Sequence, residues 1–315
     1  LRLVLVKIYA KRKYPELDFH AEPKDSALKQ KNAALLHQVV GIIVNNTDTT
    51  VLTICLGTKS LLEVSVYGVY MMVVNAVNQL MTSFSNGLTA GFGEVIAKNE
   101  EETLKKSYSS YEYMYFVIMF IVIACMGVLI LPFVGVYTVN LTDVQYVRPL
   151  LGLLFTLIVL MQNVRIPGLT IICAAVHYKE TRYQAILEAV INITVSLGLV
   201  WKLGMAGVLL GTVCSYGYRS FDIVFYTSRH LVKGCAKISL IRIVRNGIAV
   251  AFLCIVGTYV IPQNMASFII WFLYAIGMVV VSVFTIVGVN YVVEPDEFKE
   301  LVLRVKGILG RKKED

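Results

Sequence analysis

Eight apolar stretches, each long enough to cross a lipid bilayer, occupy most of this chain. A membrane-spanning helix needs roughly 20 mostly apolar residues. Of the 315 residues, 57% are hydrophobic and 16% are charged, a balance that a water-facing surface cannot carry. None of the stretches alternates with a period of two, which excludes a barrel. The sequence therefore predicts an all-α, polytopic transmembrane bundle with eight spans, at residues 33–56, 61–84, 111–137, 150–176, 183–201, 205–226, 244–261 and 266–289.

Basic residues alternate between the two ends of these spans. Lys and Arg concentrate in the cytoplasmic connections of membrane proteins. Here they gather before the first span and after the second, fourth, sixth and eighth, where the group after the sixth includes Arg242. The other connections hold only Lys59, Arg148 and Lys202. We therefore predict a multi-pass protein of the cell membrane with both ends in the cytoplasm. The net charge of +8 is then membrane-surface charge, and we predict no nucleic acid partner.

The chain divides into four predicted segments. Residues 1–32 are a cytoplasmic segment that follows a truncated span, because an apolar stub precedes a basic run there. Residues 33–230 form a six-helix lobe, residues 231–293 two additional transmembrane helices, and residues 294–315 a cytoplasmic tail. Within the tail we predict an amphipathic helix on the membrane surface. Its apolar face consists of Phe298, Leu301, Val302, Val305 and Ile308.

Polar side chains at membrane depth are the candidates for function, because each is costly in hydrocarbon and normally faces a bundle interior or an aqueous cavity. The first span carries a polar block that includes Asn45, Asn46 and Asp48. The second span repeats the i, i+3, i+4 spacing with Asn75, Asn78 and Gln79. Amides in such positions often do no more than hydrogen-bond a neighbouring helix, so that reading stays open for the second span.

The fourth span combines a cation with a helix breaker near its centre. Asn163 and Arg165 precede Pro167, and a broken helix beside a cation is how many transporters build a site for an anionic substrate. In the fifth span Glu188 lies on a polar stripe, near enough to the cytoplasmic end to be wetted from there. We predict that Arg165 and Asp48 line one shared, water-reachable cavity, and an ion pair between them would fit their depths.

Two further patterns bear on packing and chemistry. Gly207 and Gly211 form a GxxxG step, which predicts a tight hairpin of the fifth and sixth spans. The six cysteines are scattered one per segment without a CxxC pair, so neither metal nor disulfide roles are indicated. The sequence has no Walker lysine loop and no usual catalytic constellation. We therefore predict that the protein is not an enzyme and uses no cofactor.

Four stretches of the sequence carry a resemblance to a known protein family. They are YAKRKYPELDF, HQVVGIIVNNTDTTVLTICLG, SVYGVYMMVVNAVNQL and AGFGEVIAKNEEE. With these stretches the chain resembles the polysaccharide biosynthesis flippases. These are the O-antigen-type translocases of the MOP (multidrug, oligosaccharidyl-lipid, polysaccharide) exporter superfamily, which are similar to MATE transporters. The resemblance runs from about Tyr9 to Lys233 and weakens over the last two spans.

The resemblance implies a transporter of about 12 to 14 helices in two lobes around a cavity that opens alternately to either side. On this interpretation the chain is the second lobe plus two extra helices, and the missing N-terminal lobe of the same protein is its partner. The substrate is an undecaprenyl-diphosphate-linked oligosaccharide, moved among membrane lipids to the outer leaflet. Arg165 would contact the diphosphate or an acidic sugar. The implied substrate-binding residues are Arg165, Asn45, Asn46, Asp48, Asn75, Asn78, Gln79 and Asn163.

Two other functions compete with lipid-linked oligosaccharide export. A cation-coupled multidrug or small-molecule antiporter of the same superfamily would use several carboxylates at membrane depth, and Asp48 and Glu188 are the clear ones here. A membrane glycosyl polymerase or ligase would need large outward loops that hold catalytic side chains. The longest predicted outward loop, residues 138–149, is too small for that purpose.

Overall fold

The computed structural model describes residues 2–14, 30–85, 88–98, 100–262, 265 and 267–300. These residues form helices and no strand, as the sequence predicts. The helices in chain order are α1 (Arg2–Lys13), α2 (Lys31–Cys55), the short 3-10 helix η2 (Gly57–Lys59), α3 (Ser60–Ser85), α4 (Leu88–Ala97), α5 (Glu101–Tyr137), α6 (Pro149–Val164), α7 (Ile166–Ala174), α8 (Arg182–Leu203), α9 (Met205–His230), α10 (Cys235–Val260) and α11 (Phe268–Val293).

Six helical stretches of the described chain are long and apolar enough to cross a membrane. They are Ser60–Ala97, Glu101–Tyr137, Pro149–Ala174, Arg182–Leu203, Cys235–Val260 and Phe268–Val293. The α2 and α9 helices have 25 and 26 residues, respectively, but are not among the six. Both carry polar side chains at mid-length, such as Asp48 in α2 and Arg219 in α9. The protein is therefore a helical bundle of the multi-pass membrane type, and the eight spans stay a prediction.

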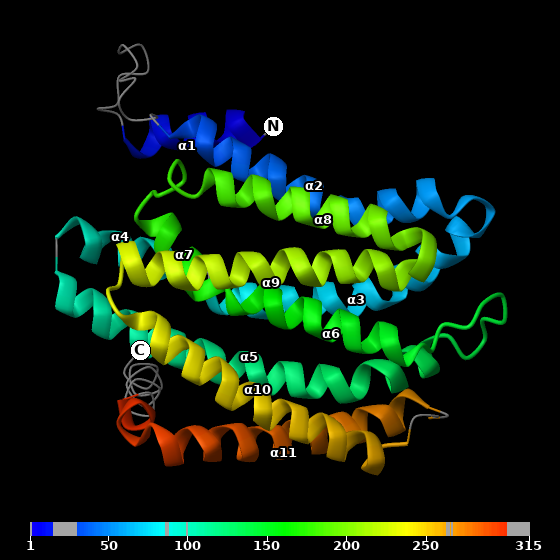
Figure 1. The fold of residues 1–315 in the computed structure, drawn as a ribbon. Helices are drawn as coiled ribbons and strands as arrows, with labels where there is room; N and C mark the ends of the chain where they lie inside the picture. Colours follow the sequence, from blue (N-terminus) through cyan, green and yellow to red (C-terminus); the bar gives the residue numbers. More distant parts are fainter. Residues whose placement is uncertain are drawn as a thin grey trace.

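The long helices lie side by side, and their connections gather at two opposite ends of the bundle (Figure 1). At one end, on the left in Figure 1, lie the α7–α8 and α9–α10 connections and the start of α2. We call this the basic end, because the connections there carry most of the basic residues. At the opposite end, α2 joins α3, α5 joins α6, α8 joins α9 and α10 joins α11. The observed arrangement thus places the predicted basic connections together.

The α5 helix separates two parts of the bundle. It contacts α3, α6 and α7 on one side and α10 and α11 on the other. Its apolar side chains, such as Tyr115, Phe116 and Phe120, are almost completely buried against these neighbours. On the outer face of α11, by contrast, Phe272 and Phe284 are exposed, as suits a surface in contact with hydrocarbon. The part formed by α2, α3 and α6 to α9 contains the polar residues that the sequence predicts as a site at membrane depth.

The predicted tight hairpin of α8 and α9 is present. A Cβ atom added to Gly207 would lie 2.5 Å from the backbone oxygen of Leu199. One added to Gly211 would lie 2.8 Å from the backbone nitrogen of Ser196. Side chains at these two positions would therefore push the helices apart. The turn between the helices is made by Gly204, whose φ of +58° is a conformation that favours glycine.

The start of α10 differs from the sequence prediction. The α10 helix begins at Cys235, whereas we predict the span from residue 244. Arg242, which the basic pattern assigns to a connection, therefore lies inside α10 with only 2% of its side chain exposed. That assignment is wrong because the charge is neutralised by carboxylates within the bundle. Near the C-terminus a helical segment begins at Pro295, as predicted, and includes Phe298. The remaining predicted apolar face, at residues 301, 302, 305 and 308, falls outside the described residues.

Candidate functional site

The fourth predicted span is broken at Arg165, which separates α6 from α7. Pro167 in the first turn of α7 has no backbone N–H, and its ring clashes with the carbonyl group of Asn163, so the helix cannot continue regularly. Gly168 then lets α7 approach α9 closely, since a Cβ there would lie 2.6 Å from Cγ2 of Ile223. The break is the feature that the sequence predicts, and it sets the position of the Arg165 side chain.

Arg165 belongs to a cluster of two arginines and two carboxylates, which we call the arginine–carboxylate cluster. Arg165 Nη1 donates to Glu188 Oε1 at 2.5 Å. The other oxygen of Glu188 lies 3.6 Å from Nε of Arg219, and Arg219 Nη1 lies 2.5 Å from Asp222 Oδ2. Formal charges within the cluster cancel. Its members come from the α6–α7 break, from α8 and from α9, so it joins three parts of the bundle.

Two further features of Arg165 bear on its role beside the cavity described below. Its guanidinium group lies over the Tyr216 ring, with Cζ 4.5 Å from the ring centroid, a cation–π geometry. Its Nε atom is buried and has no hydrogen-bond partner within the described chain. A buried donor without a partner is unfavourable and is a reason to look for a ligand. The side chain is 15% exposed, which leaves it reachable from the adjacent space.

That space is a cavity of about 410 Å³, which we call the arginine cavity. Arg165, Glu188 and Arg219 line its inner part. His37 at the start of α2 and Tyr178 in the α7–α8 connection line it toward the basic end. Its volume falls within the roughly 300–1,000 Å³ that is usual for sites of small ligands. The cavity is therefore large enough for a small charged group, and its lining extends from the arginine–carboxylate cluster to residues near the basic end.

A second cavity, of about 450 Å³, lies next to the first, and we call it the amide cavity. The two cavities share Val44, Asn45, Gln162 and Tyr216 as lining residues. The amide cavity is also lined by Asn75 and Asn78 from α3, by Asp48 from α2 and by Thr212 from α9. Amide and hydroxyl groups both donate and accept hydrogen bonds, so this lining suits a hydrated, neutral group such as a sugar.

Asp48 is buried in the wall of the amide cavity, with 4% of the residue exposed. Its described partners are hydroxyl groups. Thr212 Oγ1 donates to Oδ1 at 2.7 Å, and Tyr67 OH donates to Oδ2 at 3.3 Å. The predicted ion pair with Arg165 is not formed, because Arg165 pairs with Glu188. The prediction of one shared cavity is also not met, since Asp48 and Arg165 line neighbouring cavities. Tyr216 lies between them, stacked on Arg165 and donating to Asn45 at 3.2 Å.

The other predicted site residues fall into three groups. Asn45 and Asn75 line the amide cavity and are exposed. Asn78 lines it as well, and also donates to Gln162 at 2.9 Å and accepts from the buried Asn163 at 3.0 Å. Asn163 is further held by Tyr115, which donates to its Oδ1 at 2.9 Å. This chain of amides fixes α3 against α5 and α6, which is the structural role left open above.

Asn46 and Gln79 line neither cavity. Both are exposed, and the Asn46 side chain donates to the backbone oxygen of Ile42 in its own helix at 2.7 Å. The predicted substrate-binding residues do not include three members of the site, namely Glu188, Tyr216 and Arg219. A signal for two of them is present in α9, where Thr212, Tyr216 and Arg219 follow each other at helical spacing on one face.

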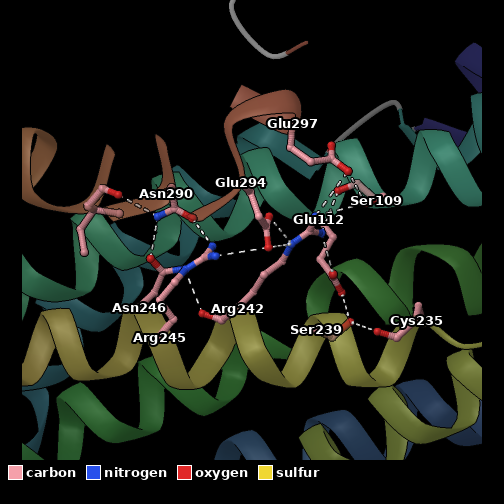
Figure 2. A network of polar contacts seen from close by, with 11 residues as sticks. Ser109, Glu112, Cys235, Ser239, Arg242, Arg245, Asn246, Asn290, Glu294 and Glu297 are labelled. Atoms are coloured by element: carbon pink, nitrogen blue, oxygen red, sulfur yellow. Dashed lines mark hydrogen bonds and ion pairs between the residues drawn. The ribbon is translucent and has the colours of Figure 1, made fainter. Parts of the chain in front are cut away.

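A second buried ionic group lies in the other part of the bundle, between α5, α10 and α11 (Figure 2). Arg242 of α10 lies 3.2 Å from Glu112 of α5, 3.0 Å from Glu294 and 3.5 Å from Glu297. It also donates to the backbone oxygen and to the hydroxyl of Ser109, both at 3.1 Å. We call this group, with the residues added below, the α5–α10–α11 network. Sequence reasoning missed it, because Arg242 was assigned to a connection.

The network continues along α10 to Arg245 and Asn246, as Figure 2 shows. Arg245 donates to Glu294 at 3.2 Å and also to Asn290 of α11. Asn290 in turn donates to Asn246 at 2.7 Å. At the other side, Ser239 donates to Glu112 at 2.6 Å. None of these residues lines the arginine cavity or the amide cavity, so the network joins helices without facing either space.

Comparison with models of known protein families finds no match for this chain, and comparison with curated proteins finds no similar sequence. Within the part of the chain that the structure describes, no group of three or more His, Cys, Asp or Glu side chains could hold a metal ion. The six cysteines are free. Inferences about function therefore depend on the two cavities and on the charges beside them.

Proposed function

We propose that this protein exports lipid-linked oligosaccharide units across the cell membrane by alternating access, for the synthesis of cell-surface polysaccharide. The observation that carries the proposal is the pair of adjoining cavities, one beside Arg165 and one lined by amides, inside a bundle of apolar helices. A lipid-linked glycan must carry a charged, hydrated head through hydrocarbon, whereas its prenyl tail can stay in lipid. Cavities of these two kinds side by side suit the two parts of such a head.

In this proposal Arg165 contacts the diphosphate or an acidic sugar of an undecaprenyl-diphosphate-linked oligosaccharide. An arginine presents a planar set of donors that matches phosphate oxygens. Asn45, Asn75 and Asn78 contact the sugars, because their amides can pair with hydroxyl groups in either direction. Export of this kind makes and breaks no covalent bond, so we propose a transporter and not an enzyme.

The topology is part of the same proposal. The α2 and α9 helices line both cavities and pack directly on α8, one of the six apolar stretches, which favours eight spans in total. The basic end is then cytoplasmic by the positive-inside rule. Under this orientation the arginine cavity is accessible from the side on which lipid-linked precursors carry their newly assembled head groups.

The exposed polar face of α2 and α3 supports a second lobe. Asn45 and Asn46 of α2 and Asn75 and Gln79 of α3 are exposed. Exposed amides are unfavourable in hydrocarbon and are tolerated at membrane depth only against protein or water. We propose that an N-terminal lobe of the same protein covers this face and closes the amide cavity. The segment assignment of residues 33–230 as one lobe and 231–293 as two added helices belongs to this proposal.

One observation favours a second candidate, a cation-coupled antiporter for small molecules. Asp48 is buried among hydroxyl donors, without a basic partner among the residues that the structure describes, and it lines a cavity. A carboxylate in such a position can take up a proton or a cation. Export of lipid-linked glycan could use the same residue for coupling, so Asp48 alone does not separate the two functions.

The test is made in cells that produce the protein naturally. Deletion of its gene should cause lipid-linked oligosaccharide to accumulate in the cytoplasmic leaflet, and the unaltered gene should relieve the accumulation. Arg165→Gln should not relieve it, whereas Arg148→Gln, at the opposite end of the bundle, should. Deletion without accumulation, combined with loss of resistance to small cationic molecules, would reject the flippase in favour of the antiporter.

A further inference from the structure

The carboxylate of Glu188 lies between two arginines without saturating either of them. Arg165 uses one nitrogen, Nη1, to bind Glu188, and its Nε has no partner among the described residues. Arg219 faces the second oxygen of Glu188 at 3.6 Å, which is beyond the normal length of a hydrogen bond. The three groups are on different elements, so their meeting point is a property of the fold and not of one helix.

The ion pair of Arg148 with Glu63 shows, by contrast, an arginine whose nitrogens all have acceptors. Arg148 binds both oxygens of Glu63 through its two terminal nitrogens, at 2.8 and 2.9 Å. Its Nε donates to the backbone oxygen of Gln145 at 2.9 Å. Each of the three nitrogens of Arg148 therefore has an acceptor. Arg165 lacks this fork geometry even though it is the more buried of the two arginines.

The charges of the cluster limit what can enter the arginine cavity. Arg165 and Arg219 are balanced by Glu188 and Asp222, so an entering anion finds no net positive charge. Asp222 is paired with Arg219, three positions away on the same helix, and holds that arginine in place. Glu188, which contacts both arginines, is the group that an incoming anion must replace.

We propose that Arg165 and Arg219 form a two-arginine anion site that Glu188 occupies in this conformation and that a diphosphate group enters by displacing Glu188. This inference extends the proposed function and depends on it for the identity of the ligand. A diphosphate carries two sets of oxygens and more charge than one carboxylate, so it can engage both arginine forks where Glu188 engages one nitrogen of Arg165. Displacement also frees α8, which carries Glu188, from the α6–α7 break.

The ligand chemistry can come from the head group of a prenyl lipid or from free diphosphate. The test therefore uses the full chain in detergent micelles with three probes: farnesyl diphosphate, inorganic pyrophosphate, and farnesol, which lacks phosphate. Binding is measured by titration calorimetry for the unaltered protein, Glu188→Gln and Arg165→Gln. The matched control is Glu63→Gln, which makes the same chemical change beside the saturated Arg148.

We expect Glu188→Gln to bind farnesyl diphosphate about tenfold or more tightly than the unaltered protein, because the competing charge is gone and the side-chain shape is kept. Glu63→Gln should bind as the unaltered protein does, and Arg165→Gln should lose binding. Farnesol should not bind at this site. Equal or weaker binding by Glu188→Gln would overturn the proposal. Pyrophosphate binding as tight as that of farnesyl diphosphate would support the anion site and overturn the lipid head group as its ligand.

A stability measurement keeps the test decisive if Glu188→Gln folds poorly. The variant leaves two arginines with one carboxylate, so its thermal midpoint should fall. Saturating pyrophosphate should raise that midpoint more than it raises the midpoint of the unaltered protein, because a ligand stabilises the state that binds it. Equal rises in both proteins would overturn the proposal. Tight anion binding in a protein whose deletion causes no accumulation of lipid-linked glycan would reject the proposed function and leave the anion site standing.

Discussion

The two buried ionic groups of this protein differ in how fully their central arginines, Arg242 and Arg165, are satisfied. Arg245 at the edge of the network also has a buried Nε without a partner among the described residues, but it lines neither cavity. In the α5–α10–α11 network, Arg242 meets three carboxylates and two oxygens of Ser109. In the arginine–carboxylate cluster, the described residues give Arg165 one carboxylate contact and leave its Nε without an acceptor. Both arginines are buried or nearly so, so burial does not separate them. Unused donors beside a cavity mark a site, whereas a saturated arginine between three helices marks a structural connection.

The comparison predicts its largest effect for Arg242→Met. Removal of the guanidinium leaves Glu112, which is only 2% exposed, without its cation, and breaking a buried pair in this way costs about 3–5 kcal/mol. We expect a large fall in the midpoint of thermal unfolding in detergent and low yields of folded protein. The paired change Arg242→Met with Glu112→Gln should recover part of the loss, since the carboxylate that is only 2% exposed then carries no unpaired charge. An unchanged midpoint of thermal unfolding for Arg242→Met would show that the network does not stabilise the fold.

The second effect, for Arg165→Gln, should appear in function more than in stability. Glu188 retains Arg219 as a partner after this substitution, so we expect a loss of about 1–2 kcal/mol in unfolding free energy. Export measured by accumulation of lipid-linked oligosaccharide should fall as in the deletion. A stability loss as large as that of Arg242→Met would erase the distinction between the two groups.

Asp48→Asn should have a smaller effect on stability. The amide oxygen can still accept from Thr212 or Tyr67, and no ion pair is lost, so the change in unfolding free energy should be about 1 kcal/mol or less. If Asp48 carries the coupling charge, export should become insensitive to ionophores that collapse proton or sodium gradients. Export that keeps its full dependence on the gradient would exclude Asp48 from coupling.

Local patterns in the sequence predicted the features that depend on neighbouring residues. Hydropathy located the long helices, Pro167 located the break at Arg165, and the GxxxG step at Gly207 and Gly211 located the α8–α9 hairpin. These features follow from backbone chemistry and from the size of side chains within one or two elements.

Contacts between helices distant in the sequence were not predicted. Glu188 was interpreted as a wetted end residue, and its meeting with Arg165 and Arg219 depends on how α8 packs beside α9 and α6. Asp48 and Arg165 have similar depths, which suggested a common cavity, but depth does not fix the rotation of a helix. Tyr216 fills the space between them. Arg242 was assigned to a connection because of its positive charge. The sequence around it does not show that three carboxylates from other parts of the chain lie beside it inside the bundle.

The smallest expected effect is that of Glu297→Gln. It tests whether a residue at the edge of the network contributes less to stability than Arg242 at its centre. Glu297 lies at its edge, with 27% of its side chain exposed and its Oε1 at 3.5 Å from Arg242. Because Arg242 keeps Glu112 and Glu294 when Glu297 becomes Gln, the loss should be about 0.5–1 kcal/mol, the size of a partly exposed ion pair. Asp296→Asn, whose side chain is 96% exposed, is the matched control and should leave the unfolding midpoint unchanged. A loss for Glu297→Gln close to that for Arg242→Met would mean that the network acts as one indivisible unit, so that counting satisfied donors would no longer distinguish its centre from its edge.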